Sequence, residues 1–251
     1  MRKLFFITIL FVTANAFSQG KTLYDVEMVQ PKMGQSKAFE KAWKAHVIKF
    51  HNGNDKRVIE EIMTGNNAGN LLLISGPSSI ADFDMERPTQ PAHDADYDLT
   101  VTPSVSTFTN YGSYRWVDTL SYNGAMNTDK YSTTVYHLKP GKTGDLTAEI
   151  KRAVTINKKI NSSASYNTYI KMWAGSNGEV VISTNLKDGF KQLDNTFDPN
   201  MRTMNDNFKN AYIQEYGQAA WDNRNKLLPE ITNSWETYLS KVRKDLSSTS
   251  K

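Results

Sequence analysis

The 251-residue sequence contains no cysteine. This absence excludes disulfide bonds, a lipid anchor attached through cysteine and catalysis by a thiolate nucleophile. Stability must therefore come from a hydrophobic core, and the chain is long enough to bury one.

A large excess of one charge sign is also absent. The sequence holds 30 Lys and Arg residues against 26 Asp and Glu residues, a formal charge of +4. Removing Arg2 and Lys3 with an N-terminal signal would take this charge to 4 − 2 = +2. The basic residues form no dense stripe, so we expect no nucleic-acid partner.

Long apolar runs are missing as well. The N-terminal run Leu4–Val12 is well short of the roughly 20 residues that a transmembrane helix needs. Arg2 and Lys3 precede this run, and Ala14 and Ala16 offer a small-residue cleavage site. These features predict a secretory signal peptide over residues 1–19. We expect an exported protein, periplasmic or secreted, with no integral membrane segment after signal cleavage.

The common catalytic and cofactor motifs are absent too. The sequence contains no Gly-x-Ser-x-Gly motif, no Walker loop and no dinucleotide fingerprint. The sequence therefore predicts no cofactor.

The chain does contain a recognisable order of elements in its second half. Residues 133–138 are rich in β-formers and stop at the turn Lys139-Pro140-Gly141-Lys142, because Pro140 has no N–H for a strand ladder. An amphipathic helix follows, in which Leu146 and Ile150 share an apolar face. Two strands then flank the turn Gly175-Ser176-Asn177-Gly178.

The first half repeats that order with different residues. Lys32-Met33-Gly34 stands at the first turn, and an apolar helical stripe follows from Phe39 to Phe50. We predict two units, over residues 20–125 and 126–251, each with the order strand, helix, strand, strand, helix, strand. The second unit carries an insertion around residues 195–216.

Two signals disagree over the last element. Residues from Ile231 to Leu246 fit helical spacing, but their counterpart in the first unit, Val105–Leu120, has the composition of a strand. Because duplicated units share their secondary structure, we expect a strand for much of Glu236–Asp245.

Two βαββαβ units in tandem, with the strand, Lys-Pro-Gly-Lys turn and helix described above, resemble the dimeric α+β barrel superfamily. That superfamily includes proteins similar to antibiotic-biosynthesis monooxygenases and to NIPSNAP. The resemblance implies an α+β fold in which two ferredoxin-like units join their antiparallel sheets into one barrel, here within a single chain. It carries over no functional residues, because these families perform varied chemistry on one fold.

Strand alternation suggests which side chains point into such a barrel. If Leu138 and Ile170 pack on the helices, His137, Tyr169, Lys171 and Trp173 turn inward, and Glu61 is the first-unit counterpart of Lys171. A cavity with these side chains is a candidate small-molecule site, with His137 as acid or base and Glu61, Tyr169, Lys171 and Trp173 as ligand-binding residues. In the alternative interpretation, Glu61 and Lys171 are exposed or form a structural pair, and His137 only makes a hydrogen bond inside a filled barrel.

The other histidines do not form a metal motif in the sequence. His46 and His51 are five residues apart, about 140° around a helix, so they do not match the i, i+4 pair of a metal site. His46 lies on the apolar stripe, where we expect a hydrogen-bonded core residue, and His51 is expected on the surface or at the helix end. The acidic segment His93–Asp98 lacks the glycine and glutamate of a calcium loop. The sequence therefore predicts no metal site.

Three hypotheses for function follow. The first is a monomer or homodimer that binds a small apolar or aromatic molecule inside the barrel. The second is a cofactor-independent oxygenase or isomerase-like enzyme that uses the same cavity, with His137 as the base. The third is a partner-binding protein whose barrel is filled by its own side chains.

Overall fold

The computed structural model describes residues 20–51, 56–85, 89–124, 128–173, 175, 177–194 and 199–248, without the side chains of residues 199–204. The predicted signal peptide over residues 1–19 and the predicted unit boundary near residue 125 lie outside these ranges, so both stay predictions. Among the described helices, none is long and apolar enough to cross a lipid bilayer.

The first unit has four strands and a helical layer. Its first turn depends on glycine, because Gly34 has a φ of +75°, as does Gly141 at the corresponding turn of the second unit. Short helical turns occur at Ile80–Asp84, Tyr97–Val101 and Thr102–Ser104. The main elements are β1 (Leu23–Pro31), α1 (Ser36–Phe50), β2 (Arg57–Ile62), β3 (Leu71–Ser78), α2 (Gln90–Asp96) and β4 (Val105–Trp116).

The second unit repeats this order after a short turn at Asp118–Leu120 and has a larger helical layer. The predicted insertion is the long helix α5, and the disputed last element is a strand, as the repeat predicted. The elements are β5 (Lys130–Leu138), α3 (Thr143–Lys159), β6 (Tyr166–Lys171), β7 (Glu179–Asn185), α4 (Lys191–Asp194), α5 (Pro199–Tyr216), α6 (Gln218–Ile231) and β8 (Thr232–Val242).

All eight strands form one closed antiparallel barrel in the order β1-β3-β2-β8-β5-β7-β6-β4. Within each unit the order is the same, β4-β1-β3-β2 and β8-β5-β7-β6. The units meet at two equivalent seams, where β2 pairs with β8 and β4 pairs with β6. The predicted α+β fold, two ferredoxin-like units that share one barrel, is therefore confirmed.

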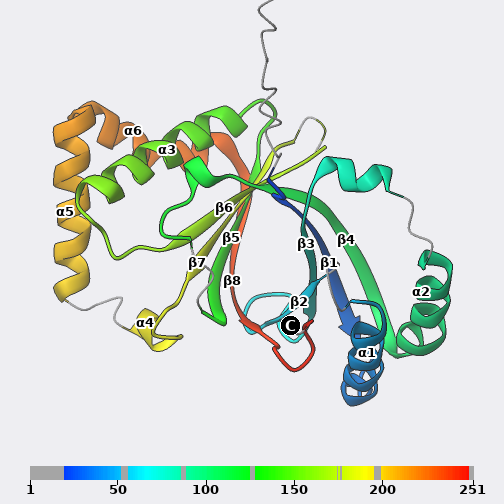
Figure 1. The fold of residues 1–251 in the computed structure, drawn as a ribbon. Helices are drawn as coiled ribbons and strands as arrows, with labels where there is room; N and C mark the ends of the chain where they lie inside the picture. The colour runs from blue at the N-terminus through cyan, green and yellow to red at the C-terminus, as the bar shows by residue number, and fades with distance from the viewer. Residues whose placement is uncertain are drawn as a thin grey trace, which may run out of the picture.

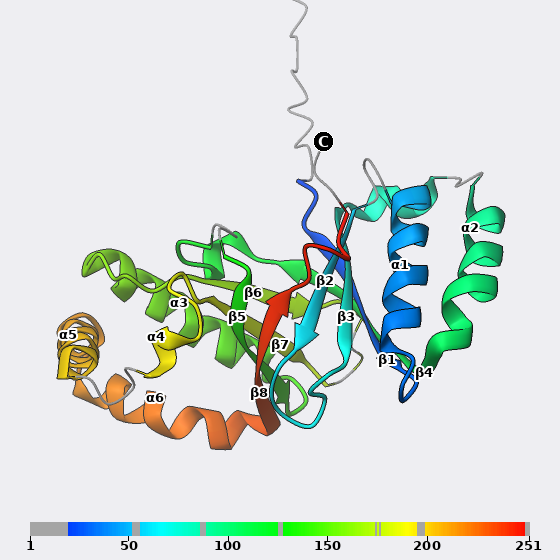
Figure 2. The same cartoon turned by 90° about the horizontal axis from the view of Figure 1, so that it is seen from below.

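The helices cover the outside of the barrel on two opposite sides (Figures 1 and 2). Helices α1 and α2 cover the first unit, and α3 and α6 cover the second, with α5 packed against α3 and α6 farther from the sheet. Under α1, the buried side chains of Phe39, Trp43 and Val47 pack on the outer face of the sheet. Under α3, Leu146, Ile150 and Val154 pack in the same way. The two apolar stripes that the sequence pattern identified are thus the cores between the helices and the sheet.

Candidate functional site

The interior of the barrel contains a cavity of about 200 Å³ that opens to solvent. Its walls are mainly apolar and come from both units, because every second residue of each strand points inward. The aliphatic part of the wall includes Val26, Val58, Ile62, Leu72, Ile74, Val135 and Val181. Six tyrosines also line the cavity: Tyr24, Tyr111, Tyr114, Tyr131, Tyr169 and Tyr238.

A polar cluster around Glu179 forms one part of the cavity wall. The Tyr114 hydroxyl donates a short hydrogen bond to the Glu179 carboxylate. His137 Nδ1 lies 3.2 Å from Glu179 Oε2, and Lys171 Nζ lies 3.5 Å from the same oxygen. Burial and the adjacent Glu179 carboxylate raise the pKa of Tyr114, so its hydroxyl keeps its proton. The His137 side chain is 42% exposed, so this cluster is accessible from solvent.

Glu60 is a second carboxyl in the cavity, with different surroundings. Protein atoms surround it, and its accessible surface faces the cavity rather than the outside of the barrel. The Ser240 hydroxyl donates a 2.7 Å hydrogen bond to Glu60 Oε2. Burial raises the pKa of Glu60, and the Ser240 hydrogen bond offsets only part of this effect. The Glu60 carboxyl therefore holds its proton to a higher pH than an exposed glutamate does, and in the protonated form it can donate a hydrogen bond into the cavity.

Two of the predicted site residues, His137 and Tyr169, line the cavity. Lys171 lies beside them, with its ammonium 5.6 Å from the centre of the Tyr114 ring. Trp173 was expected to point inward, but it follows the end of β6 and is 68% exposed. Its ring packs against Phe83 instead of lining the cavity, because the strand alternation that predicted its direction has already ended.

The inward direction predicted for Glu61 is wrong. Glu61 lies on the outer face of β2, where its carboxylate is 3.4 Å from Arg243 Nη1. In the β2–β3 ladder, Ile59 faces Leu73, and both belong to the core under α1. The cavity wall is made by the alternate residues, including Glu60. The repeat alignment was one residue out of step in β2, and such a shift moves every side chain to the other face.

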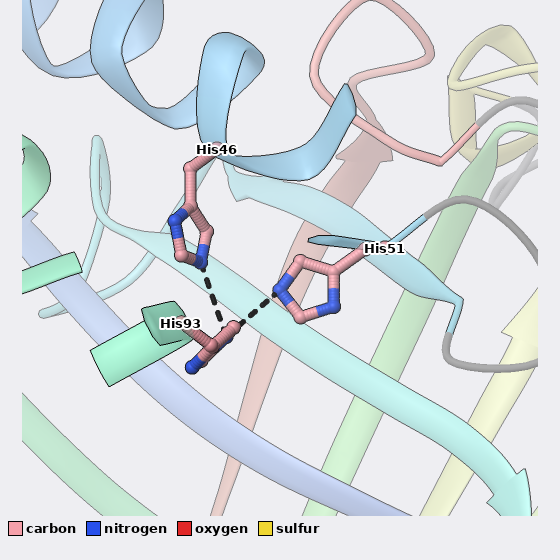
Figure 3. Close-up of side chains that lie close together, drawn as sticks. All are labelled: His46, His51 and His93. Carbon is pink, nitrogen blue, oxygen red and sulfur yellow. Dashed lines mark hydrogen bonds between the residues drawn. The ribbon is translucent and has the colours of Figure 1, made fainter. Parts of the chain in front are cut away.

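His46 and His51 also need a revised description. His46 is buried and hydrogen-bonded to Asp96, as the apolar stripe predicted. The surface position predicted for His51 is wrong, because His51 is only 1% exposed. Helix α1 ends at Phe50, so the angular spacing of a helix does not apply to His51. Its ring folds back toward His46 and meets His93 of α2, outside the barrel (Figure 3).

The comparisons with known proteins support the fold. No protein-family model matches the sequence, and no curated protein is significantly similar to it. A monooxygenase-like protein from Lactobacillus acidophilus NCFM has a similar structure, with a TM-score of 0.54 and 9% identity over 91% of this chain and 96% of its own. An anthrone oxidase-like protein has a TM-score of 0.52 and 8% identity over 88% and 91%.

A second monooxygenase-like protein, from Fusobacterium nucleatum, has a TM-score of 0.50 and 13% identity over 88% of this chain and 92% of its own. At these identities the similarity shows the fold alone. The predicted α+β barrel architecture is thus confirmed, and the chemistry has to be argued from the residues of the cavity.

Proposed function

We propose that this is an exported protein that binds a small, mainly apolar ring compound carrying one hydrogen-bonding group. The observation that carries the proposal is the cavity in the barrel, with apolar walls and a few polar groups at separate points. Its volume of about 200 Å³ suits one ring with a short substituent, since a dry apolar cavity of about 150 Å³ holds benzene. The Glu60 carboxyl and the surrounding tyrosine hydroxyls supply the hydrogen bonds.

Titration of the protein with phenol and indole tests this proposal, with benzoate as a charged comparison. Chemical shifts of the methyl groups that line the cavity report binding. We expect phenol and indole to shift these signals and benzoate to bind more weakly, because its charge would be buried among apolar side chains.

The variant Val135→Phe fills part of the cavity and should abolish these shifts. The matched control is Thr134→Phe, which places the same ring on the other face of β5, where Thr134 bonds Thr237 on the adjacent strand. If Val135→Phe is folded and binds phenol as tightly as the unmodified protein, the ligand does not occupy the cavity.

A second candidate function is proton-transfer catalysis, as in an isomerase or a cofactor-independent oxygenase. The 3.2 Å contact between His137 Nδ1 and the Glu179 carboxylate favours it, because a carboxylate beside Nδ1 favours the proton on that nitrogen and leaves Nε2 as a base. In such a step Nε2 removes a proton from an acidic C–H bond of the bound compound, and the electron pair stays on the compound as an enolate. Reprotonation in D₂O then delivers deuterium to the same carbon.

Exchange of the α-hydrogens of cyclohexanone in D₂O measures this step directly. We expect His137→Ala to lose the protein-dependent exchange by about 100-fold while keeping its stability and its affinity for phenol. A protein that binds ring compounds but exchanges no protons would be a binding protein only. Exchange that survives His137→Ala would remove the proposed role of His137.

A further inference from the structure

Three of the four histidines in the chain meet in one cluster outside the barrel (Figure 3). His46 lies in α1, His51 follows the end of α1, and His93 lies in α2. His93 Nε2 is 3.1 Å from His46 Nε2 and 3.2 Å from His51 Nε2. One ligand atom from each ring falls within 4.8 Å of the others. None of the three lines the barrel cavity, so the cluster is a separate site.

Carboxylates on the far side of two rings determine which nitrogens carry protons. His46 Nδ1 lies 2.9 Å from Asp96 Oδ2, and His93 Nδ1 lies 2.9 Å from Asp94 Oδ1. A carboxylate only accepts hydrogen bonds, so Nδ1 is the protonated nitrogen in both rings. In the neutral rings each Nε2 then carries a lone pair, and the 3.1 Å contact sets two lone pairs against each other. A cation bound by both nitrogens resolves this conflict.

The surroundings of the cluster disfavour a charged ring as the alternative. His46 and His51 are buried, and the Trp43 ring packs against both of them. The His93 side chain keeps an exposed fraction of 20%, so an ion and a water molecule can reach the nitrogens from that side.

His51 has a different second contact. Arg57 Nε donates a 3.4 Å hydrogen bond to His51 Nδ1, so in the neutral ring the proton lies on Nε2, which faces His93 Nε2 at 3.2 Å. Ligation through Nε2 needs a proton on Nδ1, so the Arg57 side chain has to turn away when an ion binds. A small adjustment of one partly exposed side chain therefore accompanies binding.

We propose that His46, His51 and His93 bind a divalent transition-metal ion, with Zn²⁺ as the best match. Imidazole nitrogens suit late first-row metals, and nitrogens at about 2.0 Å from a tetrahedral ion lie roughly 3.3 Å apart. Two of the three observed separations, 3.1 and 3.2 Å, are close to this value, and the ligand atoms of the third pair lie within 4.8 Å. Asp96 and Asp94 orient two ligand rings through Nδ1, the arrangement in which a carboxylate supports a zinc-bound histidine. Three protein ligands leave a fourth position for water.

Calorimetric titration of the mature, chelator-treated protein with ZnCl₂ tests the proposal. We expect one ion per chain, and X-ray absorption of the loaded protein should find nitrogen neighbours at about 2.0 Å. The variant His93→Ala should weaken binding by more than about 100-fold, and Asp96→Asn by about 10- to 100-fold. Circular dichroism confirms that each variant is folded, and Asp96→Asn keeps the test usable if His93→Ala is not.

The matched control is His137→Ala, which removes the one histidine outside the cluster. It should bind Zn²⁺ like the unmodified protein. The proposal is overturned if the unmodified protein shows no stoichiometric binding of Zn²⁺. It is also overturned if the folded variants at His93 and Asp96 keep the full affinity, or if the affinity is lost only with His137.

Discussion

The two units bury their polar groups in different ways. In the second unit, Glu149 of α3 and Glu179 of β7 each accept a hydrogen bond from a tyrosine hydroxyl and also meet a cationic side chain. In the first unit, Glu60 of β2 meets the hydroxyl of Ser240 and an otherwise mainly apolar cavity. His46 of α1 and His93 of α2 face each other through their Nε2 atoms at 3.1 Å.

This difference separates structural polar groups from functional candidates. A buried network in which each charge has an opposite charge and each acceptor a donor mainly contributes stability and a unique geometry. A buried polar group with few hydrogen-bond partners lowers the stability of the folded protein. Such a group is therefore a candidate for contact with a ligand or an ion. The Glu149 network of the second unit is thus a structural feature, whereas Glu60 of the first unit has hydrogen-bonding capacity left for a ligand.

The largest expected effect comes from breaking the network of the second unit. Glu149 accepts a 2.8 Å hydrogen bond from Tyr212 and a short contact from Arg224, whose guanidinium also stacks on the Tyr212 and Trp221 rings. Glu149→Gln keeps the size of the side chain but leaves Arg224 without its counter-charge. Urea unfolding should show a loss of about 2 kcal/mol, because a hydrogen bond to a charged group contributes about 1.5–3 kcal/mol.

The control for Glu149→Gln is Glu215→Gln in the same helical layer. Glu215 pairs with Lys159 at 2.8 Å, but both side chains are at least 40% exposed. An exposed pair contributes at most about 1 kcal/mol, so this variant should lose little stability. Equal losses for the two variants would show that the Glu149 network is as weak as a surface pair, and the contrast between the units would fail.

Most of the fold could be predicted from the sequence because the duplication supplied evidence that local patterns lack. The strand β8 shows this best, since helical spacing from Ile231 onward favoured a helix and only the comparison with β4 favoured a strand. In the structure, β8 pairs with β5 over nine residue pairs from Lys130 to Leu138, and this pairing overrides the local helical pattern. The long insertion α5 was likewise found from the spacing between the repeats.

The candidate sites were harder to predict because they depend on single-residue register and on long-range contacts. In β2, the sequence Val58-Ile59-Glu60-Glu61-Ile62 does not alternate cleanly, so it gives little sign that Glu60 rather than Glu61 faces inward. Glu179 could have been found as the residue that pairs with His137 across the β5–β7 ladder. The histidine cluster joins α1 to α2, and no sequence spacing encodes that contact.

A smaller effect, which varies with pH, tests the first-unit side of the comparison. Burial raises the pKa of Glu60 above the ordinary glutamate value of 4.5. As pH rises above this value, the unfolded chain releases the Glu60 proton while the folded protein keeps it, so the free energy of unfolding falls. Glu60→Gln has no such proton and still accepts the Ser240 hydrogen bond. We therefore expect the variant to gain stability relative to the unmodified protein between about pH 4 and pH 8.

Urea unfolding of both proteins at each end of that pH range measures the change. Glu236→Gln is the control, because Glu236 also lines the cavity but is exposed, and water hydrates its carboxylate in the folded and unfolded states. The gain should appear for Glu60→Gln and be absent for Glu236→Gln. A stability difference that stays constant with pH for Glu60→Gln would show that Glu60 is hydrated or paired in the folded protein. Glu60 would then be as well satisfied as Glu179, and the first unit would lose its main hydrogen-bond donor for a cavity ligand.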